Sequence, residues 1–519
     1  MRSTSSSTHS RITSWTQRQH DAHVSGGWTA RRAGSRGGEL TPVGFHAQER
    51  PRTVAIVDWS HLVEDFLDNL GLSFEAFCRD VTGGWMFGYV EALAAAGCRA
   101  DILCVSARVT AVTRHRHEPT GATIVVLPAT PLYRALRRAV PNPYAPMLEN
   151  AVAASYGPRR VWLAALKEIA GYASTPLGAL AREIRRYDAV ICQEYESPRF
   201  DACVLLGLAI GRPVFGTFQG GNWQLSHLER PVRPLTLRAS AGLIVGTRSE
   251  HMRLAARYGL DDRRIARIFN PLNTAPWFET SAEDVRGVVR ASLGIPAHAS
   301  VVAWHGRMDL HRKGLDVLIA AERELRQRGD GVRLLLIGTG RDASELRRML
   351  SAHPIEGLTW VDRYVTDKRE LARLLSAADV YAFPSRHEGF PVAPIEAMAC
   401  GIPVVAANAD GVADILEGGE ASGGLVVPTD DAGALACALA RLLDDDTLRR
   451  EFGRRARERV AGHFSVEAVG GALRQLLFRD SASDDRPAAR VVGWPANRYP
   501  AAVRGSALAF SAERQEGGP

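Results

Sequence analysis

A basic sequence motif whose residue types could bind a ligand follows a strand-like run at 301–304. We call this motif the basic string. It begins His305-Gly306-Arg307 and, after five intervening residues, continues Lys313-Gly314. Gly306 lets the backbone approach a ligand closely, and Arg307 would lie at the carboxyl end of the strand. Lys313 would open the next helix, whose N-terminus favours anions. Two cations at a helix end suit a diphosphate, whereas the alternative interpretation is a surface turn with solvated cations.

An acidic string lies further along, from Pro384 to Val405. Glu388 is placed in a loop rich in Gly and Pro, and Glu396 lies seven intervening residues later within a helix of small residues at 393–399. A buried carboxylate needs hydrogen-bond donors, and sugar hydroxyls are natural ones. The amides of Gly389 and Phe390 would point from the loop toward a ligand. The alternative is a helix-capping acid beside an unrelated surface acid.

Alternating strands and helices must position these strings. We predict strands at 54–58, 100–105, 123–127, 189–192, 213–218, 242–245, 301–304, 333–337, 358–361, 380–383 and 403–406. We predict helices at 87–96, 161–187, 200–210, 315–328, 343–350, 393–399, 432–443 and 466–478. This rhythm indicates an α/β fold with two doubly wound parallel sheets, whose ligands bind at the carboxyl ends of the strands, in a cleft between domains.

Composition excludes several classes of protein. The 519 residues are 46% hydrophobic and 23% charged, which is a globular balance. No apolar run approaches the roughly 20 residues of a membrane span. Seven cysteines without a C-x-x-C pair argue for a reducing compartment and against a zinc or disulfide framework. Residues 1–50 and 481–519 are poor in apolar periodicity, and we expect both to be disordered tails.

The two strings together resemble a known family. G-R-x5-K-G, combined with E-x7-E followed by A-M-A-C-G-I-P-V-V, is similar to the retaining nucleotide-sugar glycosyltransferases of family four, glycosyl transferases group 1. The likeness is strongest over 301–428 and weaker over 52–273. It implies a GT-B fold of two Rossmann-like domains facing a cleft. Residues 51–275 would bind the acceptor, 276–463 the nucleotide sugar, and a helix at 464–480 would cross back to the first domain.

The resemblance also implies roles for individual residues. Arg307 and Lys313 would hold the donor diphosphate and stabilise the charge on the leaving nucleotide. Glu388 would contact the hydroxyls of the donor sugar, and Glu396 those of the ribose. Backbone at four glycines and one aromatic residue would line the donor site: Gly306, Gly338, Gly340, Gly389 and Phe390. The turn at 362–364 departs from the family pattern near the base.

Loops of the N-terminal half would meet the acceptor. Gly83 and Gly84 match a glycine-rich loop of the family. Where many members carry histidine, this chain has Gln193 and Gln219. A neutral amide is no general base, but retaining transfer can use the leaving phosphate to accept the proton. Glu194 and its neighbour Glu196 are either acceptor contacts or ordinary loop and salt-bridge acids.

The implied partners are a nucleotide-sugar donor and an unidentified acceptor: a glycan, a lipid or a small molecule. We expect a hexosyltransferase-type enzyme of glycan biosynthesis that needs no metal or other cofactor, because cations and helix ends neutralise the diphosphate. We expect a cytoplasmic location, including the inner face of the cell membrane.

Two alternative functions stay open. One is a nucleotide-sugar epimerase on the same fold. The other is a charge-driven protein that binds membranes or nucleic acid, although we expect no nucleic acid partner. Arginines crowd the stretch 108–160, and the pattern of Leu132, Tyr133, Leu136 and Val140 is typical of an interfacial helix. The competing interpretation is a solvated arginine-rich face.

Overall fold

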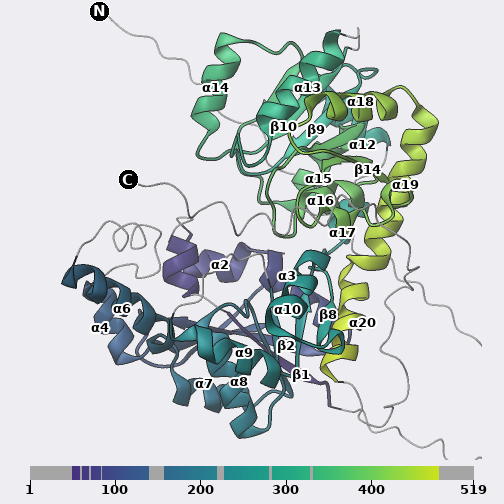
Figure 1. The fold of residues 1–519 in the computed structure, drawn as a ribbon. Coiled ribbons are helices and arrows are strands. Elements are labelled where there is room, and N and C mark those ends of the chain that lie inside the picture. Colours follow the sequence, from purple (N-terminus) through teal and green to yellow (C-terminus); the bar gives the residue numbers. More distant parts are fainter. Residues whose placement is uncertain are drawn as a thin grey trace, which may run out of the picture. The chain divides into compact units, whose positions relative to one another are not determined.

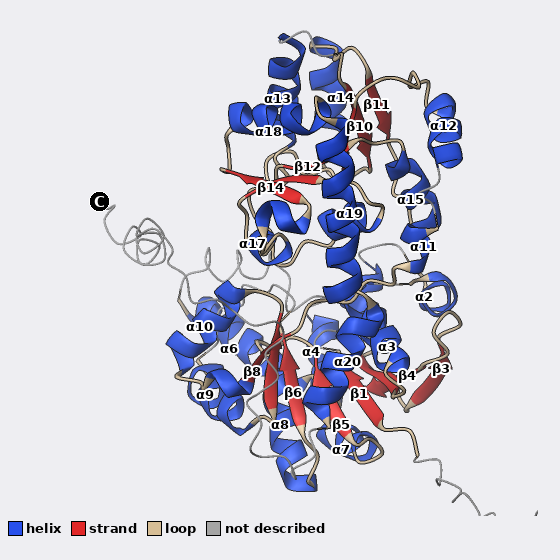
Figure 2. Cartoon of the chain, turned by 90° about the vertical axis from the view of Figure 1, so that its right-hand side faces the viewer, coloured by secondary structure: helices blue, strands red, loops and turns tan. Residues whose placement is uncertain are grey.

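Two β-sheets organise the chain in the computed structural model (Figures 1 and 2). The structure describes residues 50–58, 61–68, 72–82, 84–139, 157–218, 227–279, 283–327 and 331–478. Both predicted tails therefore lie outside the described residues, apart from Arg50. The described residues from Pro51 onward belong to one compact unit.

The N-terminal sheet has eight strands within the described residues, in the order β3-β4-β2-β1-β5-β6-β7-β8. Their bounds are β1 (Thr53–Val57), β2 (Arg99–Ser106), β3 (Thr113–Arg116), β4 (Thr123–Pro128), β5 (Ala189–Cys192), β6 (Val214–Thr217), β7 (Gly242–Val245) and β8 (Ile265–Arg267). All neighbouring strands pair in parallel except β3, which runs antiparallel to β4 at the sheet edge. The expectation of purely parallel sheets was wrong at this edge, because the polar Thr-Arg-His-Arg segment carries no apolar strand signal.

The C-terminal sheet is entirely parallel, in the order β11-β10-β9-β12-β13-β14. Its strands are β9 (Val301–His305), β10 (Arg333–Ile337), β11 (Leu358–Val361), β12 (Val380–Phe383), β13 (Val404–Ala407) and β14 (Gly424–Val427). Strands β9, β12 and β13 are buried at every residue, and β10 is buried at every residue except Arg333, as expected for a sheet covered by helices on both faces. The fold class is confirmed as α/β with two mainly parallel sheets.

Helices connect the strands. In the N-terminal half they are the π-helix η1 (Leu62–Leu67), α2 (Phe74–Asp80), α3 (Gly84–Ala95), α4 (Pro131–Ala139), α6 (Pro158–Ala173), α7 (Leu177–Ile184), α8 (Pro198–Ile210), α9 (Glu229–Ala239), α10 (Arg248–Tyr258), the 3₁₀ turn η2 (Asp262–Arg264) and α11 (Ala275–Phe278). In the C-terminal half they are α12 (Glu283–Ser292), α13 (Leu315–Gln327), α14 (Ala343–Ala352), α15 (Lys368–Ser376), α16 (Ala393–Ala399), α17 (Val412–Ile415), the 3₁₀ turn η3 (Gly419–Ser422), α18 (Ala432–Leu443), α19 (Asp446–His463) and α20 (Val466–Leu477).

The single helix expected over 161–187 was wrong. The chain forms α6 and α7 instead, with a break at Ser174–Pro176. Pro176 has no N–H to donate and disfavours helical geometry at the preceding residue, so the first helix ends before it.

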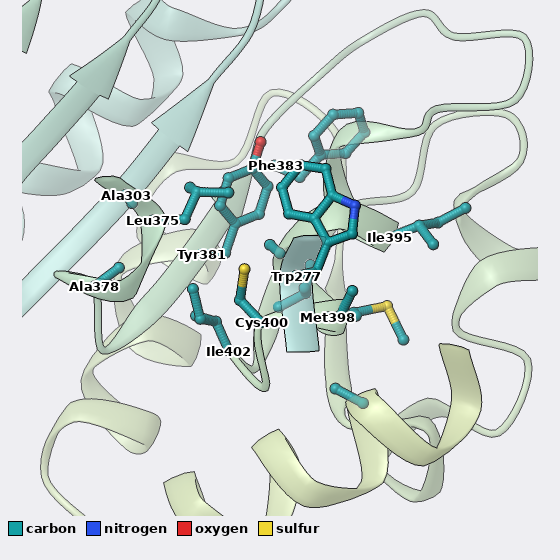
Figure 3. Packing of buried hydrophobic residues seen from close by; sticks show 14 of the residues in the cluster. Trp277, Ala303, Leu375, Ala378, Tyr381, Phe383, Ile395, Met398, Cys400 and Ile402 are labelled. Atoms are coloured by element: carbon teal, nitrogen blue, oxygen red, sulfur yellow. The ribbon is translucent and has the colours of Figure 1, made fainter. Parts of the chain in front are cut away.

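Apolar clusters lie on both faces of each sheet. On one face of the C-terminal sheet, Figure 3 shows Trp277 gathered with Tyr381, Ile395, Met398 and Cys400. The apolar side of α16 is thereby anchored in the core, which orients the rest of that short helix.

The last described helix, α20, packs on α3. A Cβ at Gly470 would lie 2.0 Å from the carbonyl oxygen of Ala92, so only glycine permits this helix contact.

The proposed domain boundaries stay predictions. No helix in the described part of the chain is both long and apolar enough to cross a membrane.

Candidate functional site

The residues predicted to bind the donor lie at the carboxyl ends of the strands of the C-terminal sheet. We call this end of the sheet the site edge. Strand β9 lies between β10 and β12, so the loops that follow these three strands are neighbours. The Gly306 N–H donates to the carbonyl of Ile337 over 3.0 Å, and the Met308 N–H donates to that of Thr339 over 3.0 Å. These bonds lock the loop carrying Arg307 to the loop of Gly338 and Gly340.

Glycine is required where these loops touch. Gly338 has a φ of 135°, and a Cβ there would lie 2.0 Å from the carbonyl oxygen of Gly306. Gly314 has a φ of 64°, and its Cβ would lie 2.0 Å from the carbonyl oxygen of Pro384. Both glycines therefore hold loop backbones closer together than any side chain would permit.

The predicted residues Lys313 and Glu388 form an ion pair. The Nζ–Oε1 distance is 2.7 Å, and 18% of the lysine side chain and 7% of the glutamate side chain are exposed. Lys313 lies in the turn before α13 and not in its first turn, which corrects the expectation that it opens the helix. Arg307 is exposed and forms no ion pair with any described residue. One cation at this edge is thus unpaired, and the other has a partner that a phosphate could replace.

Glu396 is buried on α16 and accepts a hydrogen bond at each carboxylate oxygen. Oε2 lies 2.9 Å from Nε2 of His305, and Oε1 lies 2.8 Å from Nζ of Lys368. Burial by itself would raise the pKa of Glu396, but the ammonium of Lys368 and the hydrogen bond from His305 outweigh it and lower that pKa to about 2. The carboxylate is therefore ionised and fixed in orientation at neutral pH.

His305 and Lys368 were not recognised in the sequence as site residues. His305 is the last residue of β9 and adjoins Gly306, so its position was visible although its role was not. Lys368 is the first residue of α15, and its Nζ lies 5.7 Å from the ring centre of Trp277. Burial acts to lower the pKa of Lys368, but Glu396 reverses the effect and raises it. Only the folded chain brings this lysine to the carboxylate.

Arg386 ties the two functional loops together. Its guanidinium donates to both carboxylate oxygens of Asp316 over 2.8 Å and also binds the carbonyl of His311 and the side chain of Asp430. Its backbone N–H donates to the carbonyl of Arg312 over 3.0 Å. The loop that carries Glu388 is thereby held against the loop that carries Lys313.

The backbone N–H groups of Gly389 and Phe390 donate no hydrogen bond to a described residue. The expected contact of these two N–H groups with a ligand stays a prediction. The Phe390 ring packs 5.4 Å from the ring of Phe269. The departing turn at 362–364 places Tyr364 on the surface with 70% exposure.

The predicted acceptor loops are only partly described. Gly83 and Gln219 lie outside the described residues, while Gly84 begins α3. After β5, Gln193 is fully buried, and Glu194 is buried with a φ of 66°, a backbone conformation rare for residues other than glycine. Glu196 pairs with Arg253 over 2.7 Å, as the salt-bridge interpretation anticipated.

No group of three or more His, Cys, Asp or Glu side chains among the described residues is arranged to hold a metal ion. The expectation of a metal-independent site stays a prediction.

Comparisons with known proteins agree with this arrangement. The family described as Glycosyl transferases group 1 matches residues 299–445, which include Arg307, Lys313, Glu388 and Glu396. The phosphatidyl-myo-inositol mannosyltransferase of Mycolicibacterium smegmatis is 32% identical over 324 residues, covering 55% of this chain and 82% of that enzyme. The D-inositol 3-phosphate glycosyltransferase of Corynebacterium aurimucosum is 32% identical over 260 residues, covering 49% of this chain and 60% of that enzyme.

Solved structures support the fold. Sucrose-phosphate synthase from Thermosynechococcus elongatus aligns with a TM-score of 0.55 at 23% identity, over 82% of this chain and 98% of that chain. Anabaena HepE, solved in complex with UDP, aligns with a TM-score of 0.57 at 16% identity, over 82% of this chain and 99% of that one. The fold is that of the GT-B glycosyltransferases. By its sequence and its fold, the chain belongs to the glycosyl transferases group 1 family and is a glycosyltransferase.

Proposed function

We propose that the protein is a retaining glycosyltransferase of family four that moves a sugar from a nucleotide-diphosphate sugar to a glycan, lipid or small-molecule acceptor. The observation that best supports this proposal is the arrangement at the carboxyl ends of β10, β9 and β12. There Lys313 pairs with Glu388, and Glu396 is held in its ionised form. Cations for a diphosphate and carboxylates for hydroxyl groups thus lie on adjoining loops and on α16.

The names of relatives narrow the substrates to test. Two relatives are named for transfer to inositol compounds, and HepE was solved with UDP and with UDP-glucose. We therefore propose inositol phosphates and phosphatidylinositol as the first acceptors to try. The donor panel combines UDP- and GDP-linked hexoses, since another relative is named as dependent on GDP-mannose.

The proposed reaction needs no protein base. The bond between the anomeric carbon and the phosphate oxygen breaks, and the acceptor oxygen bonds to the same face of that carbon. The acceptor proton passes to the departing phosphate oxygen. Arg307 and Lys313 stabilise the negative charge that builds on this phosphate. When Lys313 turns to the phosphate it releases Glu388, whose carboxylate then accepts hydrogen bonds from the donor sugar.

The N-terminal loops are consistent with this route. Gln193 is a buried neutral amide that can orient a hydroxyl but cannot take its proton at neutral pH. We propose that the reaction needs no metal, and activity in excess chelator tests this point. The cysteines at positions 78, 98, 104, 192, 203 and 400 are free thiols, which fits the proposed cytoplasmic location.

The first experiment screens nucleotides by thermal shift, because a ligand of the folded state raises the unfolding midpoint. The matching nucleotide sugar is then incubated with each acceptor, and proton NMR reads the anomeric configuration of the product. A retained configuration is expected. An inverted anomer would contradict the retaining mechanism, and conversion of the donor to an epimer without any acceptor would instead support the epimerase.

A further inference from the structure

The helices α4 and α6 form an antiparallel pair on the N-terminal half and lie side by side in Figure 1. The hydroxyl of Thr130, just before α4, donates to the carbonyl of Ala173 at the end of α6. The end of α4 that carries Arg138 therefore lies toward the beginning of α6, where Arg159 and Arg160 stand. We call the exposed side of this pair the α4/α6 surface.

Large apolar side chains of the α4/α6 surface face solvent. Val161 is 70% exposed, Trp162 57%, Leu132 55% and Ile169 46%. Trp162 and Ile169 are seven residues apart, so they project from one side of α6. The core needs neither of them, because Leu163, Leu166 and Ala170 already bury the opposite side of that helix. Helix α6 is therefore apolar on its exposed side as well as on its buried side. An exposed apolar patch of this kind is typical of an interaction surface.

This apolar patch is surrounded by positive charge. Helices α4 and α6 together contain five arginines and one lysine against a single glutamate. Arg134, Arg138, Arg159 and Arg160 form no ion pair with any described residue. Arg454 on α19 is different, because it pairs with Glu451 and Glu458. These four arginines therefore have no counter-charge among the residues that the structure describes.

The structure refines the sequence interpretation of this region. Tyr133 was expected to belong to the apolar interfacial face, but it is fully buried and stacks on His61 at 4.4 Å. Val140 lies outside the described residues. The exposed apolar face is supplied mainly by α6, which the sequence had not singled out.

We propose that the α4/α6 surface binds an anionic lipid bilayer. Tryptophan and aliphatic side chains insert at the level of the headgroups, and neighbouring arginines bind lipid phosphates while their stems cover apolar surface. Nucleic acid would use the arginines but would leave Trp162 and Ile169 exposed to water. The inference does not depend on the donor or on the stereochemistry of transfer. It would place the protein at the membrane whether or not the acceptor is a lipid.

Vesicle co-sedimentation tests the proposal with the full chain. We expect binding to vesicles of 70% phosphatidylcholine and 30% phosphatidylglycerol, weak binding to pure phosphatidylcholine, and loss of binding as salt rises. Neutralising two arginines in Arg159→Gln/Arg160→Gln should weaken binding about 30-fold, at roughly fivefold for each charge near an anionic surface. Trp162→Ala should weaken it about tenfold through lost apolar burial.

Matched controls come from the C-terminal half. Arg323→Gln removes an exposed arginine of α13, and Val288→Ala trims a side chain of α12 that is 70% exposed. Neither should change vesicle binding, and circular dichroism should show all variants folded. Brominated phosphatidylglycerol should quench a component of the tryptophan fluorescence that Trp162→Phe removes.

Three outcomes would overturn the proposal. Equal binding to neutral and anionic vesicles would remove the role of charge. Equal loss in the α4/α6 variants and in the controls would remove the role of this surface. Competition by double-stranded DNA at matched phosphate concentration, with no effect of Trp162→Ala, would assign the arginines to nucleic acid.

Discussion

Ion pairs in the two halves of the molecule use the same chemistry in different surroundings. In the N-terminal half, Arg233 is fully buried and binds Asp201 and Glu229, each over 2.9 Å, while the hydroxyl of Tyr172 donates to Asp201 over 2.9 Å. In the C-terminal half, Lys313 and Glu388 pair at an edge where the lysine is 18% exposed.

The difference shows which pairs can exchange partners. The Arg233 network is closed: its carboxylates are occupied by groups of the chain, and removing one member leaves other buried polar or charged groups without their hydrogen-bond partners. The Lys313–Glu388 pair adjoins solvent and the exposed Arg307, so an incoming phosphate can take the lysine. We infer that the closed network stabilises the fold and that the open pair serves the ligand.

The closed network should give the largest effect. We expect Asp201→Ala to lower the free energy of unfolding by about 3–5 kcal/mol, because the buried Arg233 would keep only Glu229 as a carboxylate partner and the hydroxyl of Tyr172 would lose its acceptor. Urea denaturation measures this loss, and nucleotide affinity should be unchanged at temperatures where the variant is folded. Glu458→Ala, at an exposed pair of α19, is the control and should leave stability unchanged. A small loss of stability in Asp201→Ala would contradict the distinction between the closed Arg233 network and the open Lys313–Glu388 pair.

Substitutions at and beside the open Lys313–Glu388 pair should strongly reduce catalysis and change stability little. We expect Lys313→Ala to lower kcat about 10²–10³-fold, because the lysine opposes charge that develops only as the glycosidic bond breaks. Arg307→Lys should also fall short of the wild-type rate, since an ammonium lacks the two-pronged geometry of a guanidinium. Steady-state kinetics separates the cases: a change in KM alone would make both residues ordinary binding contacts.

Substitutions of the two carboxylates should affect nucleotide binding and sugar transfer differently. Glu388→Ala should abolish most transfer yet bind free nucleotide diphosphate at least as tightly as the wild type, because Lys313 loses its competing partner. Glu396→Ala should weaken nucleotide binding about 10- to 100-fold, as expected for losing hydrogen bonds to a charged acceptor. Calorimetric titration measures both affinities, and wild-type activity in either variant would refute the site assignment.

The smallest expected effect concerns pH. The pKa of Glu396 is about 2 in the folded protein, against 4.5 for an unperturbed glutamate. Its ionised form therefore adds stability that is complete above pH 4.5 and is lost as pH falls from 4.5 toward 2. Urea titrations at pH 5 and pH 3 should show a larger loss in the wild type than in Glu396→Gln. Identical losses would mean that His305 and Lys368 do not hold the carboxylate ionised.

Much of the fold was determined by local sequence. The expected ranges of β11, β12 and α16 match the structure because short apolar runs between glycine and proline signals leave one register for burial. The spacing of Gly306, Arg307 and Lys313 likewise placed the donor loops at strand ends, where parallel sheets bind ligands.

Other features were decided by contacts between distant segments. The partners of Glu396 lie 91 residues away at His305 and 28 residues away at Lys368, and no local pattern connects them. The pairing of β3 with β4 and the exposure of Trp162 on α6 are decided in the same way, by which neighbours remain to be covered after the sheets form. Sequence periodicity specifies which face of an element is apolar, but only the assembled fold determines which charges become partners and which apolar side chains stay in water.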